Sequence, residues 1–297
     1  MPRVLLIVNP FSSGVTPARL ERVEWALRSV AEVERRETEA RGHATELASA
    51  AAGVFDAIVV YSGDGTYNEA VNGASGGVPF GFVPGGGASV FPRALGLPRD
   101  AAGAARGIAG ALAAGRTRTV TLGVVNGRRF LFAAGIGPDA EAVRRIDARG
   151  RRADGRRPGN LAFGLAVAGV LLAHRLRIEP RLEVAGHGRA AFVLVANGRP
   201  YTYAGPVPLT LARDATFEDG LDFVAPRELR PLATPGLLAR ALRGTAAAAP
   251  GVLAGHDLDA FAVRCDRPLP LQADGEDLGD VVEASFVAER GALRVLA

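Results

Sequence analysis

The 297-residue sequence contains no lysine, so all 35 of its basic residues are arginines. Without lysine the chain has neither the phosphate-binding lysine of P-loop enzymes nor the strand lysine of protein kinases. It also cannot form a lysine Schiff base with a carbonyl substrate. Any nucleotide phosphates must therefore be bound by backbone amides, arginines, hydroxyl groups or a metal ion.

Cysteines, histidines and long apolar runs are also scarce. The single cysteine, Cys265, rules out an internal disulfide, and the four histidines show no metal-ligand spacing. The longest apolar stretch, 161–173, is interrupted by two glycines and falls short of the roughly 20 residues that cross a bilayer. No charged and then apolar leader follows Met1. These absences predict a cytoplasmic protein without a histidine or cysteine metal site.

The first part of the chain repeats one pattern. Three apolar runs, at 4–8, 57–61 and 80–83, each precede a loop of small residues and a helix-like stretch. The first of these helices should begin near Thr16, with Pro17 in its first turn. Strand, small-residue loop and helix in succession are typical of an open, mostly parallel sheet. Ligands of such sheets bind where the loops leave the strand ends.

The pattern changes near residue 117 to short alternating runs with frequent turns. The runs lie at 120–125, 129–133, 181–184, 191–196, 221–224 and 284–288, and helices are expected at 159–174 and 236–243. Short strands with regular turns are typical of a β-rich, sandwich-like domain. The predicted fold class is α/β plus β, with an open parallel-sheet domain over 1–117 and a β-rich domain over 118–290. Whether the residues after 290 belong to the first domain is left open.

The segment Ser62–Glu69, with sequence S-G-D-G-T-Y-N-E, is the strongest candidate for a binding site. Gly63 and Gly65 let the backbone approach phosphate oxygens, and the helix that follows points free N–H groups at the same place. An acid in such an anion site implies that Asp64 works through Mg²⁺ or takes a proton from an acceptor hydroxyl. Thr66 and Glu69 also fit a T-x-x-E capping box, which accounts for those two residues without a ligand.

Together with Ala70–Gly73, this segment resembles the G-G-D-G-T-x-N-E-x-x-N-G motif of the bacterial diacylglycerol kinase and sphingoid-base kinase superfamily. Asn9–Gly14 resembles the N-P-x-S-G loop of the same family, and 84–98 resembles its P-x-G-T-x-N-D-F-A-R-x-L-G-I-P segment. The resemblance implies that ATP and Mg²⁺ are the cofactors. It implies nucleotide contacts from Asn9, Pro10, Ser12, Ser13, Gly14, Thr38, Gly63, Asp64, Gly65, Thr66, Asn68, Glu69, Gly86 and Gly87.

The 84–98 segment departs from the family pattern at three positions. Gly87 replaces a phosphate-binding threonine, Ser89 replaces an asparagine, and Val90 replaces a frequent aspartate near the lipid head group. The glycines at 85–87 can still surround phosphates through their backbone amides. The resemblance implies that Ser89, Val90 and Asn197 border the lipid side of the cleft.

Four segments of the second domain also resemble the family. Ala134–Glu141 resembles G-x-G-x-D-A, and Asn197-Gly198-Arg199 with Gly205 resembles a loop at the cleft. Residues 216–222 resemble D-G-x-L-D, which implies a structural Mg²⁺ held by Thr216, Asp219 and Leu221, although an Asp-Gly hairpin accounts for them equally. The D-G-E at 274–276 implies that Glu276 is the general base that takes the proton of a lipid hydroxyl, while Asp64 organises Mg²⁺ and the γ-phosphate.

The resemblance implies an ATP-dependent lipid kinase, most directly one that converts diacylglycerol to phosphatidic acid in a β-rich lipid-substrate domain. A kinase for sphingoid bases or other lipid alcohols is one alternative, and a non-catalytic lipid- or nucleotide-binding regulator is another, favoured by the altered stretch 87–90. A dinucleotide-binding oxidoreductase built on Gly85–Gly87 lacks the required glycine pattern and ribose-binding acid.

The stretch 144–157 carries seven arginines and two aspartates just before the apolar run 161–173. A basic segment beside an apolar helix is typical of adsorption to anionic lipid, which predicts a peripheral location at the inner face of the membrane. A charged loop before a core helix fits the same residues. No nucleic-acid partner is expected, because no aromatic residues interleave the arginines. A homodimer is left open.

Overall fold

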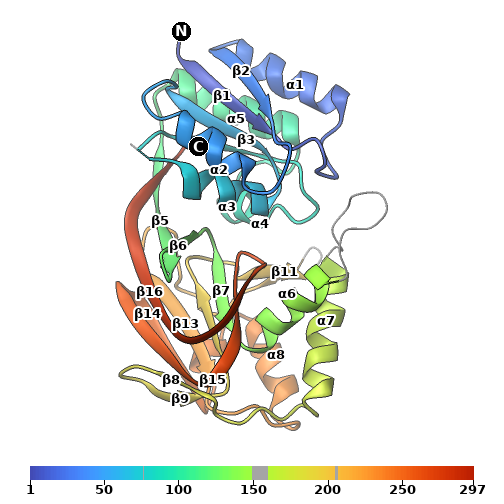
Figure 1. Cartoon of the computed structure of the whole chain (residues 1–297), viewed down its shortest axis with the longest axis vertical. Helices are drawn as coiled ribbons and strands as arrows, with labels where there is room; N and C mark the ends of the chain where they lie inside the picture. The colour runs from blue at the N-terminus through green and yellow to red at the C-terminus, as the bar shows by residue number, and fades with distance from the viewer. Residues whose placement is uncertain (76, 149–159, 205–206) are drawn as a thin grey trace. The chain divides into compact units, whose positions relative to one another are not determined.

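The computed structural model describes residues 1–75, 77–148, 160–204 and 207–297, and it divides into two compact units. Unit 1 comprises residues 1–120 and 291–297, and unit 2 comprises residues 121–290. Figure 1 labels most of the helices and strands of both units. Each unit has its own buried core, so each is described by itself.

Unit 1 is built on a parallel sheet. Its strands are β1 (Arg3–Val8), β2 (Glu32–Glu37), β3 (Ala57–Ser62) and β4 (Phe80–Pro84), in the order β4-β3-β1-β2. The end of β16 (Glu276–Val295) adds a parallel neighbour to β4 through Val295 and Phe80. The inner strands β1 and β3 are apolar and almost wholly buried, as expected for strands covered on both faces.

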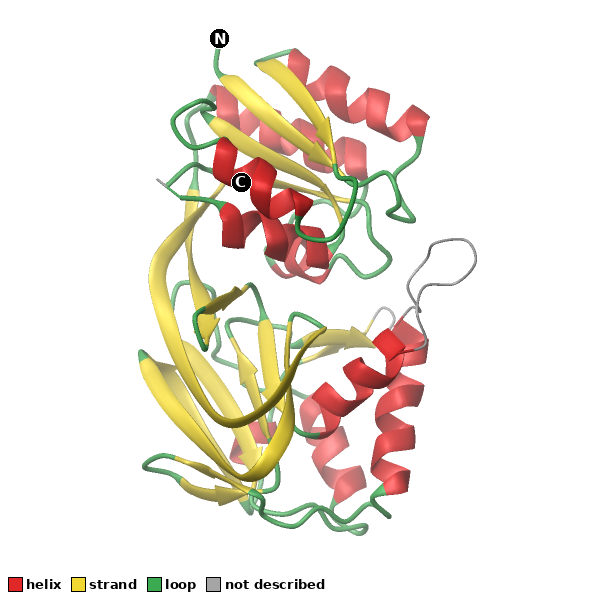
Figure 2. Cartoon of the chain, in the orientation of Figure 1, coloured by secondary structure: helices red, strands yellow, loops and turns green. Residues whose placement is uncertain are grey.

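Five helices surround this sheet: α1 (Pro17–Arg28), α2 (His43–Ala50), α3 (Asp64–Gly73), α4 (Val90–Ala94) and α5 (Ala101–Ala113). Figure 2 shows them beside the yellow strands. Val23 and Leu27 of α1 and Ile108 of α5 pack in one buried cluster with alternate residues of β1 and β3. The first helix begins after Thr16 with Pro17, as predicted.

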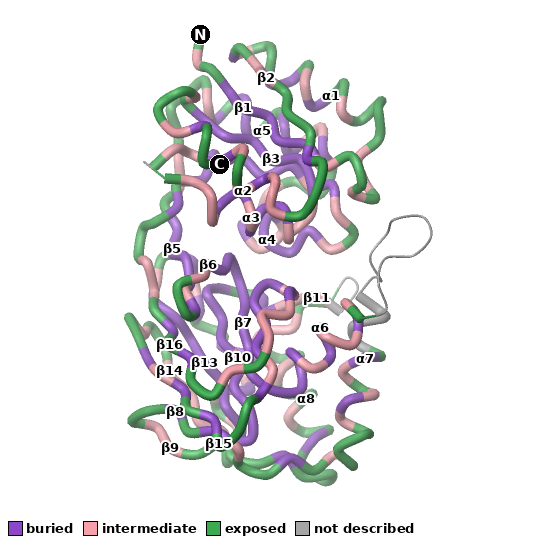
Figure 3. Tube along the Cα trace, in the orientation of Figure 1, coloured by how far each residue is buried: buried purple, intermediate pink, exposed green. Residues whose placement is uncertain are grey.

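Unit 2 is rich in antiparallel strands, and its main path runs β14-β13-β10-β7-β15-β16. The strands are β5 (Arg118–Val125), β6 (Arg128–Phe130), β7 (Ala133–Ile136), β8 (Leu182–Val184), β9 (Gly188–Ala190), β10 (Val193–Ala196), β11 (Thr202–Ala204), β12 (Val207–Leu209), β13 (Leu221–Pro226), β14 (Val252–Leu258), β15 (Ala260–Ala273) and β16. Its aromatic core includes Phe261 and Phe286, whose rings stack with centroids 4.9 Å apart. Figure 3 shows this buried core in purple.

The helices of unit 2 are α6 (Pro138–Ala148), α7 (Asn160–Ala173) and α8 (Thr234–Leu242), with a short 3-10 helix at Ala246–Ala248. The two predicted helices are confirmed as α7 and α8, whereas α6 was not predicted. No helix within the described residues is long and apolar enough to cross a membrane.

The structure confirms the predicted fold class, with a parallel α/β region first and a β-rich region after it. It corrects two local predictions. The expected strand 129–133 is broken at Leu131 and Phe132, where β6 ends and β7 has not begun. The capping box is wrong, because α3 begins at Asp64 with Gly63 as its N-cap and no side chain caps it.

Candidate active site

Three loops at the carboxyl ends of β1, β3 and β4 lie in direct contact in unit 1. The amide of Gly14 donates to the carbonyl of Gly85 at 2.7 Å, and the amide of Gly85 donates to the carbonyl of Ser62 at 2.6 Å. The hydroxyls of Ser12 and Ser62 lie 2.9 Å apart. Segments 9–14, 62–66 and 85–89, which are distant in sequence, therefore form one continuous edge.

Glycine is required where these loops touch. A Cβ atom on Gly86 would lie 2.7 Å from Cα of Gly63, and one on Gly14 would lie 2.8 Å from the carbonyl oxygen of Gly85. Contacts below 3.0 Å to backbone atoms leave no room for a side chain. Gly87 differs, because a Cβ atom there would meet nothing within 4 Å. Its side-chain position faces open space.

Asp64 ties two of the loops together. Its carboxylate accepts hydrogen bonds from the amides of Val90 at 2.9 Å and Phe91 at 3.0 Å, at the start of α4. Burial raises the pKa of Asp64 above its ordinary value, and the two amide hydrogen bonds offset part of that rise. Both carboxylate oxygens thus already have protein partners, and Asp64 holds the start of α4, directly after the 85–89 loop.

Thr66 lies in the first turn of α3 and joins the loops through its hydroxyl. Its Oγ1 atom accepts from Ser62 Oγ at 2.8 Å and from Asn9 Nδ2 at 3.2 Å. Asn68 is only 1% exposed and accepts from the side chain of Asn72, and the carbonyl of Glu69 accepts from Thr45. Among these predicted nucleotide residues, Thr66 belongs to the loop edge, whereas Asn68 bonds within α3 and Glu69 joins α3 to α2.

A cavity of about 770 Å³ lies beside Thr38, one of the predicted nucleotide contacts. Its lining includes Phe11, Arg36, Thr38, His43 and Leu47. Small-molecule pockets typically measure about 300–1,000 Å³, so a nucleoside fits by size. Phe11 is 61% exposed on the loop after β1 and offers an aromatic face. Sequence reasoning missed Phe11 and His43, because their only signal was proximity to the 9–14 and 42–45 turns.

The D-G-E segment of unit 2 forms a two-residue hairpin turn between β15 and β16. Asp274 has φ 48° and Gly275 has φ 78°, and Ala273 pairs with Glu276 across the turn. Positive φ at both central residues is the mark of a type I′ turn, for which Asp-Gly is favoured. This geometry fixes where the side chain of Glu276 begins.

Asp274 anchors that hairpin. Its carboxylate is buried and accepts hydrogen bonds from three successive amides, those of Leu131 at 2.6 Å, Phe132 at 3.0 Å and Ala133 at 3.2 Å. Successive N–H groups that converge in this way form an anion-binding nest. The nest occupies the break between β6 and β7, which is why the predicted strand 129–133 is interrupted. Sequence reasoning missed this positioning role of Asp274.

Glu276 is 9% exposed and forms an ion pair with Arg128, whose Nη2 atom lies 2.8 Å from Glu276 Oε2. The preceding amide, that of Gly275, donates to Gln272 Oε1 at 2.9 Å. Gln272 in turn donates to Asp139 Oδ2 at 2.9 Å. The predicted base is therefore held in place by a cation on one side and by a buried amide network behind it.

The position of Asp139 explains why the segment before α6 contains glycine. Tyr201 donates its hydroxyl proton to Asp139 Oδ2 at 2.6 Å, and burial raises the pKa of Asp139 above its ordinary value. A Cβ atom on Gly135 would lie 2.3 Å from the same oxygen, so the G-x-G-x-D spacing makes room for the carboxylate. This acid supports the hairpin through Gln272.

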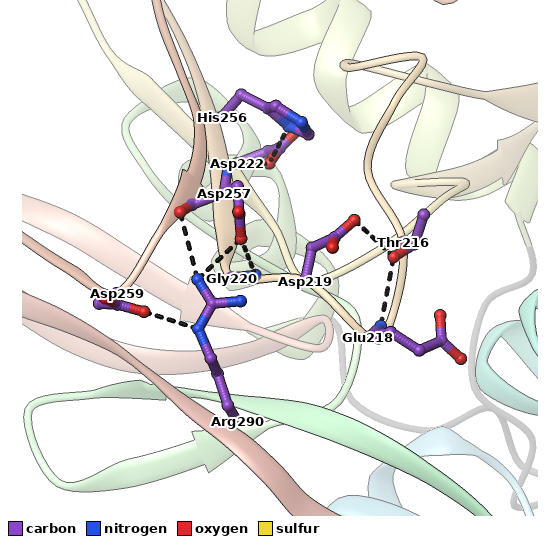
Figure 4. Close-up of polar contacts among 9 residues, drawn as sticks. All are labelled: Thr216, Glu218, Asp219, Gly220, Asp222, His256, Asp257, Asp259 and Arg290. Atoms are coloured by element: carbon purple, nitrogen blue, oxygen red, sulfur yellow. Dashed lines mark hydrogen bonds and ion pairs between the residues drawn. The ribbon is translucent and has the colours of Figure 1, made fainter.

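A structural Mg²⁺ was expected at Thr216, Asp219 and Leu221, and Figure 4 shows the first two of these residues. Thr216 donates its hydroxyl proton to Asp219 Oδ2 at 2.6 Å. Only Asp219 of the three supplies a carboxylate, and one of its oxygens is occupied by that hydroxyl. Within the described parts of the chain, no group of three histidine, cysteine or acidic side chains could hold a metal. The structural Mg²⁺ at Thr216, Asp219 and Leu221 stays a prediction, and no reaction step depends on it here.

The acids beside this loop already have cationic partners. Arg290 bonds Asp257 Oδ1 at 2.7 Å and Asp259 Oδ1 at 2.6 Å (Figure 4). Asp222 is 1% exposed and faces His256, whose Nδ1 atom lies 2.9 Å from Asp222 Oδ1. That contact raises the pKa of His256. These three neighbouring acids are therefore paired with an arginine and a histidine.

The residues expected at the lipid side of the cleft have little free surface. Ser89 and Val90 are each 4% exposed, and Asn197 is fully buried. Asn197 donates to the carbonyls of Thr121 at 2.7 Å and Leu131 at 2.8 Å, so it joins backbone segments of unit 2. Gly205 and the arginines from 149 to 157 lie outside the described residues. Arg144 and Arg145, at the start of the same basic stretch, pair with acids of unit 2.

Comparison with known proteins agrees with this geometry. Residues 3–125 match the family model of the diacylglycerol kinase catalytic domain. A diacylglycerol kinase of Bacillus subtilis strain 168 is 39% identical over 104 residues, which are 34% of this chain and 33% of that protein. The match thus spans about a third of that curated relative.

Solved structures share the fold over nearly the whole chain. A “putative diacylglycerol kinase” of Bacillus anthracis strain Sterne superposes with a TM-score of 0.78 at 22% identity, covering 99% of this chain and 95% of that one. An NAD kinase of Archaeoglobus fulgidus in complex with ATP superposes with a TM-score of 0.55 at 14% identity, covering 99% and 93%. At these identities the likeness shows the fold alone.

Proposed function

Because residues 3–125 match the diacylglycerol kinase catalytic domain, we propose that this chain transfers the γ-phosphate of ATP to the hydroxyl of a lipid, with diacylglycerol as acceptor and phosphatidic acid as product. The observation that carries this proposal is the contact of three glycine-containing loops at one edge of the parallel sheet. That edge offers backbone amides and hydroxyls for phosphate in a chain that has no lysine.

In the proposed complex the adenosine lies in the cavity beside Thr38 and the phosphates follow the 85–87 glycines. The cavity and the loop edge both belong to unit 1, and the loop after β1, which carries Phe11 and Ser12, contributes to both. The ATP complex of the similarly folded NAD kinase supports a nucleotide in this fold. We propose that Asp64 acts by holding the start of α4, where the 85–89 loop ends, since both of its oxygens bind amides there.

The proposed chemistry is an in-line displacement. Glu276 takes the proton of the lipid hydroxyl as the oxygen attacks the γ-phosphorus, the new O–P bond forms, and the bond to the β-phosphate oxygen breaks to release ADP. Mg²⁺ carried by the nucleotide would neutralise charge on the phosphate oxygens. Arg128 keeps the Glu276 carboxylate oriented, and the hairpin turn fixes its backbone. No step is assigned to a metal bound at Asp64.

The test is a transfer assay with labelled ATP, Mg²⁺ and a lipid panel of diacylglycerol, a sphingoid base and other lipid alcohols. Removal of a general base typically costs about 10²- to 10⁴-fold in rate, so Glu276→Gln should lower kcat by that factor. Asp277→Asn is the matched control, because this neighbouring acid pairs with Arg144. Transfer to no lipid, or a Glu276→Gln variant as active as Asp277→Asn, would contradict the proposal.

The same panel separates the other candidates. Transfer to the sphingoid base in preference to diacylglycerol identifies the neighbouring kinase class. A regulator is favoured by one observation: Val90, where the family often has an acid, is a buried apolar side chain. Saturable ATP binding by calorimetry with no transfer to any lipid would identify that regulator.

A further inference from the structure

The turn before α8 presents a leucine to solvent. Leu232 is 98% exposed, the highest exposure among the large hydrophobic residues with described burial. The turn is nonetheless ordered, because the carbonyl of Arg230 accepts from the amides of Ala233 at 3.0 Å and Thr234 at 3.1 Å and from the Thr234 hydroxyl at 2.9 Å. An apolar side chain is therefore held in water by a hydrogen-bonded backbone.

Helix α8 carries a second apolar side next to that turn. Leu237 packs against the buried cluster of Ile178, Phe192 and Leu229, which fixes the inner side of the helix. Leu238 and Leu242 are 52% and 53% exposed, and residues four apart share one helix face. A short surface helix normally shows polar residues on the side away from the core. Here that side includes two exposed leucines.

Arginines border these leucines. Arg240 and Arg243 are exposed on α8 and at its C-cap, three residues apart and so on a shared face. Within the parts of the chain that the structure describes, neither has a carboxylate partner, whereas Arg230 pairs with Glu228. The segment 227–256 contains four arginines and a single acid, Glu228. The surface thus combines protruding leucines with a net positive charge.

We propose that this surface, which we call the α8 face and define as Leu232, Leu238, Leu242, Arg240 and Arg243, docks the protein on an anionic lipid bilayer. Amphipathic helices bind membrane interfaces through buried apolar side chains and through cations that attract acidic head groups. Cations beside the exposed leucines favour a lipid surface over a protein partner with an apolar groove. The inference rests on the proposed lipid substrate and adds the surface that reaches it.

Vesicle sedimentation tests the proposal directly, with phosphatidylcholine vesicles prepared with and without phosphatidylglycerol. The double variant Leu238→Ser, Leu242→Ser should weaken binding by at least about tenfold, because it removes two apolar side chains from the interface. Arg240→Gln and Arg243→Gln should each weaken binding to the anionic vesicles about fivefold and leave binding to neutral vesicles unchanged. Raised salt should reduce the difference between the two kinds of vesicle.

Helix α1 provides matched controls, because Trp25 is 73% exposed there among residues of both charges. Trp25→Ser should leave vesicle binding unchanged, as should Arg22→Gln. An equal loss in these variants, or full binding by the α8 variants, would overturn the proposal. So would a wild-type dimer, seen by sedimentation velocity without lipid, that Leu238→Ser and Leu242→Ser convert to a monomer, since the face would then bind a second copy.

Activity on a water-soluble, short-chain diacylglycerol separates this inference from the proposed function. The leucine variants should keep wild-type transfer to that substrate and lose transfer to diacylglycerol in vesicles. A wild-type protein that binds anionic vesicles through the α8 face but phosphorylates neither substrate would support docking and contradict the kinase proposal. A leucine variant that loses transfer to both substrates equally would contradict a docking role.

Discussion

Each unit of the molecule fixes a loop with an aspartate that accepts hydrogen bonds from successive backbone amides, but the two aspartates do so differently. In unit 1, Asp64 accepts two amides, and glycines at 14, 63 and 86 bring the loops into contact. In unit 2, Asp274 accepts three amides and holds a hairpin turn. Unit 1 therefore relies on close backbone packing, and unit 2 relies on a buried carboxylate.

The two motifs also differ in which acids have a structural part and which have a proposed catalytic part. In unit 1 the motif acid, Asp64, is itself hydrogen-bonded to backbone amides. Its proposed part is therefore to position the loops that would bind phosphate. In unit 2 the motif contains two acids, and the first anchors the turn while the second, Glu276, remains at the end of the hairpin beside Arg128. The two acids of this motif thus differ: Asp274 holds the fold, and Glu276 is the proposed base.

The largest expected effect is on stability, from Asp274→Ala. Removing the carboxylate leaves three buried amides without a partner, which should lower the free energy of unfolding by about 3–5 kcal/mol. Asp64→Ala exposes only two amides and should cost less, about 2–3 kcal/mol. Urea unfolding measures both, with Asp274→Asn as the variant that keeps one acceptor oxygen. A larger loss for Asp64→Ala than for Asp274→Ala would reverse the comparison.

Gly86→Ala tests the close backbone packing of the loops in unit 1. The new methyl group would lie 2.7 Å from Cα of Gly63, and overpacking of this kind typically costs about 1–3 kcal/mol. ATP binding should weaken as well, because the loops must move apart. Calorimetric titration and urea unfolding measure the two effects. Gly107→Ala is the control, since its Cβ atom would meet nothing within 4 Å, and equal losses in both variants would contradict a specific contact.

Asp222 is a third buried aspartate, and unlike Asp64 and Asp274 it bonds a side chain that titrates, the imidazole of His256. His256 donates to it, and the pKa of His256 is raised above 6.5 chiefly by that hydrogen bond. A raised histidine pKa adds stability that is complete below about pH 6.5 and is lost as pH rises through the folded-state pKa. The imidazole is half exposed, so the change should stay below about 1 kcal/mol. Thermal unfolding against pH should show the loss, and His256→Gln should abolish it.

The last expected effect, of similar size, is a gain in the binding of ATP. Gly87 lies where the family has a phosphate-binding threonine, and a side chain there meets open space. Gly87→Thr should therefore fold normally and lower the KM for ATP about threefold to tenfold, the value of one added hydrogen bond. Gly87→Val, which has the same shape without the hydroxyl, is the control. A KM lowered equally by both variants would rule out the hydroxyl as the cause.

Much of the fold could be predicted because its signals are local. Buried parallel strands read as continuous apolar runs, which identified β1, β3 and β4. The edge strand β2, with sequence E-V-E-R-R-E, was missed because its residues are mostly exposed and charged. Strand β15 was missed and only 284–288 of β16 was predicted, because the pairing of the two strands shifts register between Arg264 and Leu269 and between Pro270 and Gln272.

The candidate site was predicted only in part, for a different reason. The glycine loops could be found because glycine directly after a buried strand marks a backbone that turns tightly or closely approaches another group. The nest around Asp274 and the network of Asp139, Tyr201 and Gln272 join residues more than sixty positions apart. No local sequence pattern predicts such contacts. The roles assigned to the site residues, including Glu276 as base and the division into nucleotide and lipid domains, stay predictions.

The pairing of β16 with β4 has a consequence for how the chain is made. Val295 pairs with Phe80, and the amide of Leu296 donates to the carbonyl of Phe80 at 2.8 Å, so residues 291–297 complete the sheet of unit 1. Those residues leave the ribosome only after the whole of unit 2 has been synthesised. During translation β4 is therefore an unpaired edge of the sheet on the side that β16 later covers. The β16 pairing of unit 1 can form only when unit 2 is already outside the exit tunnel.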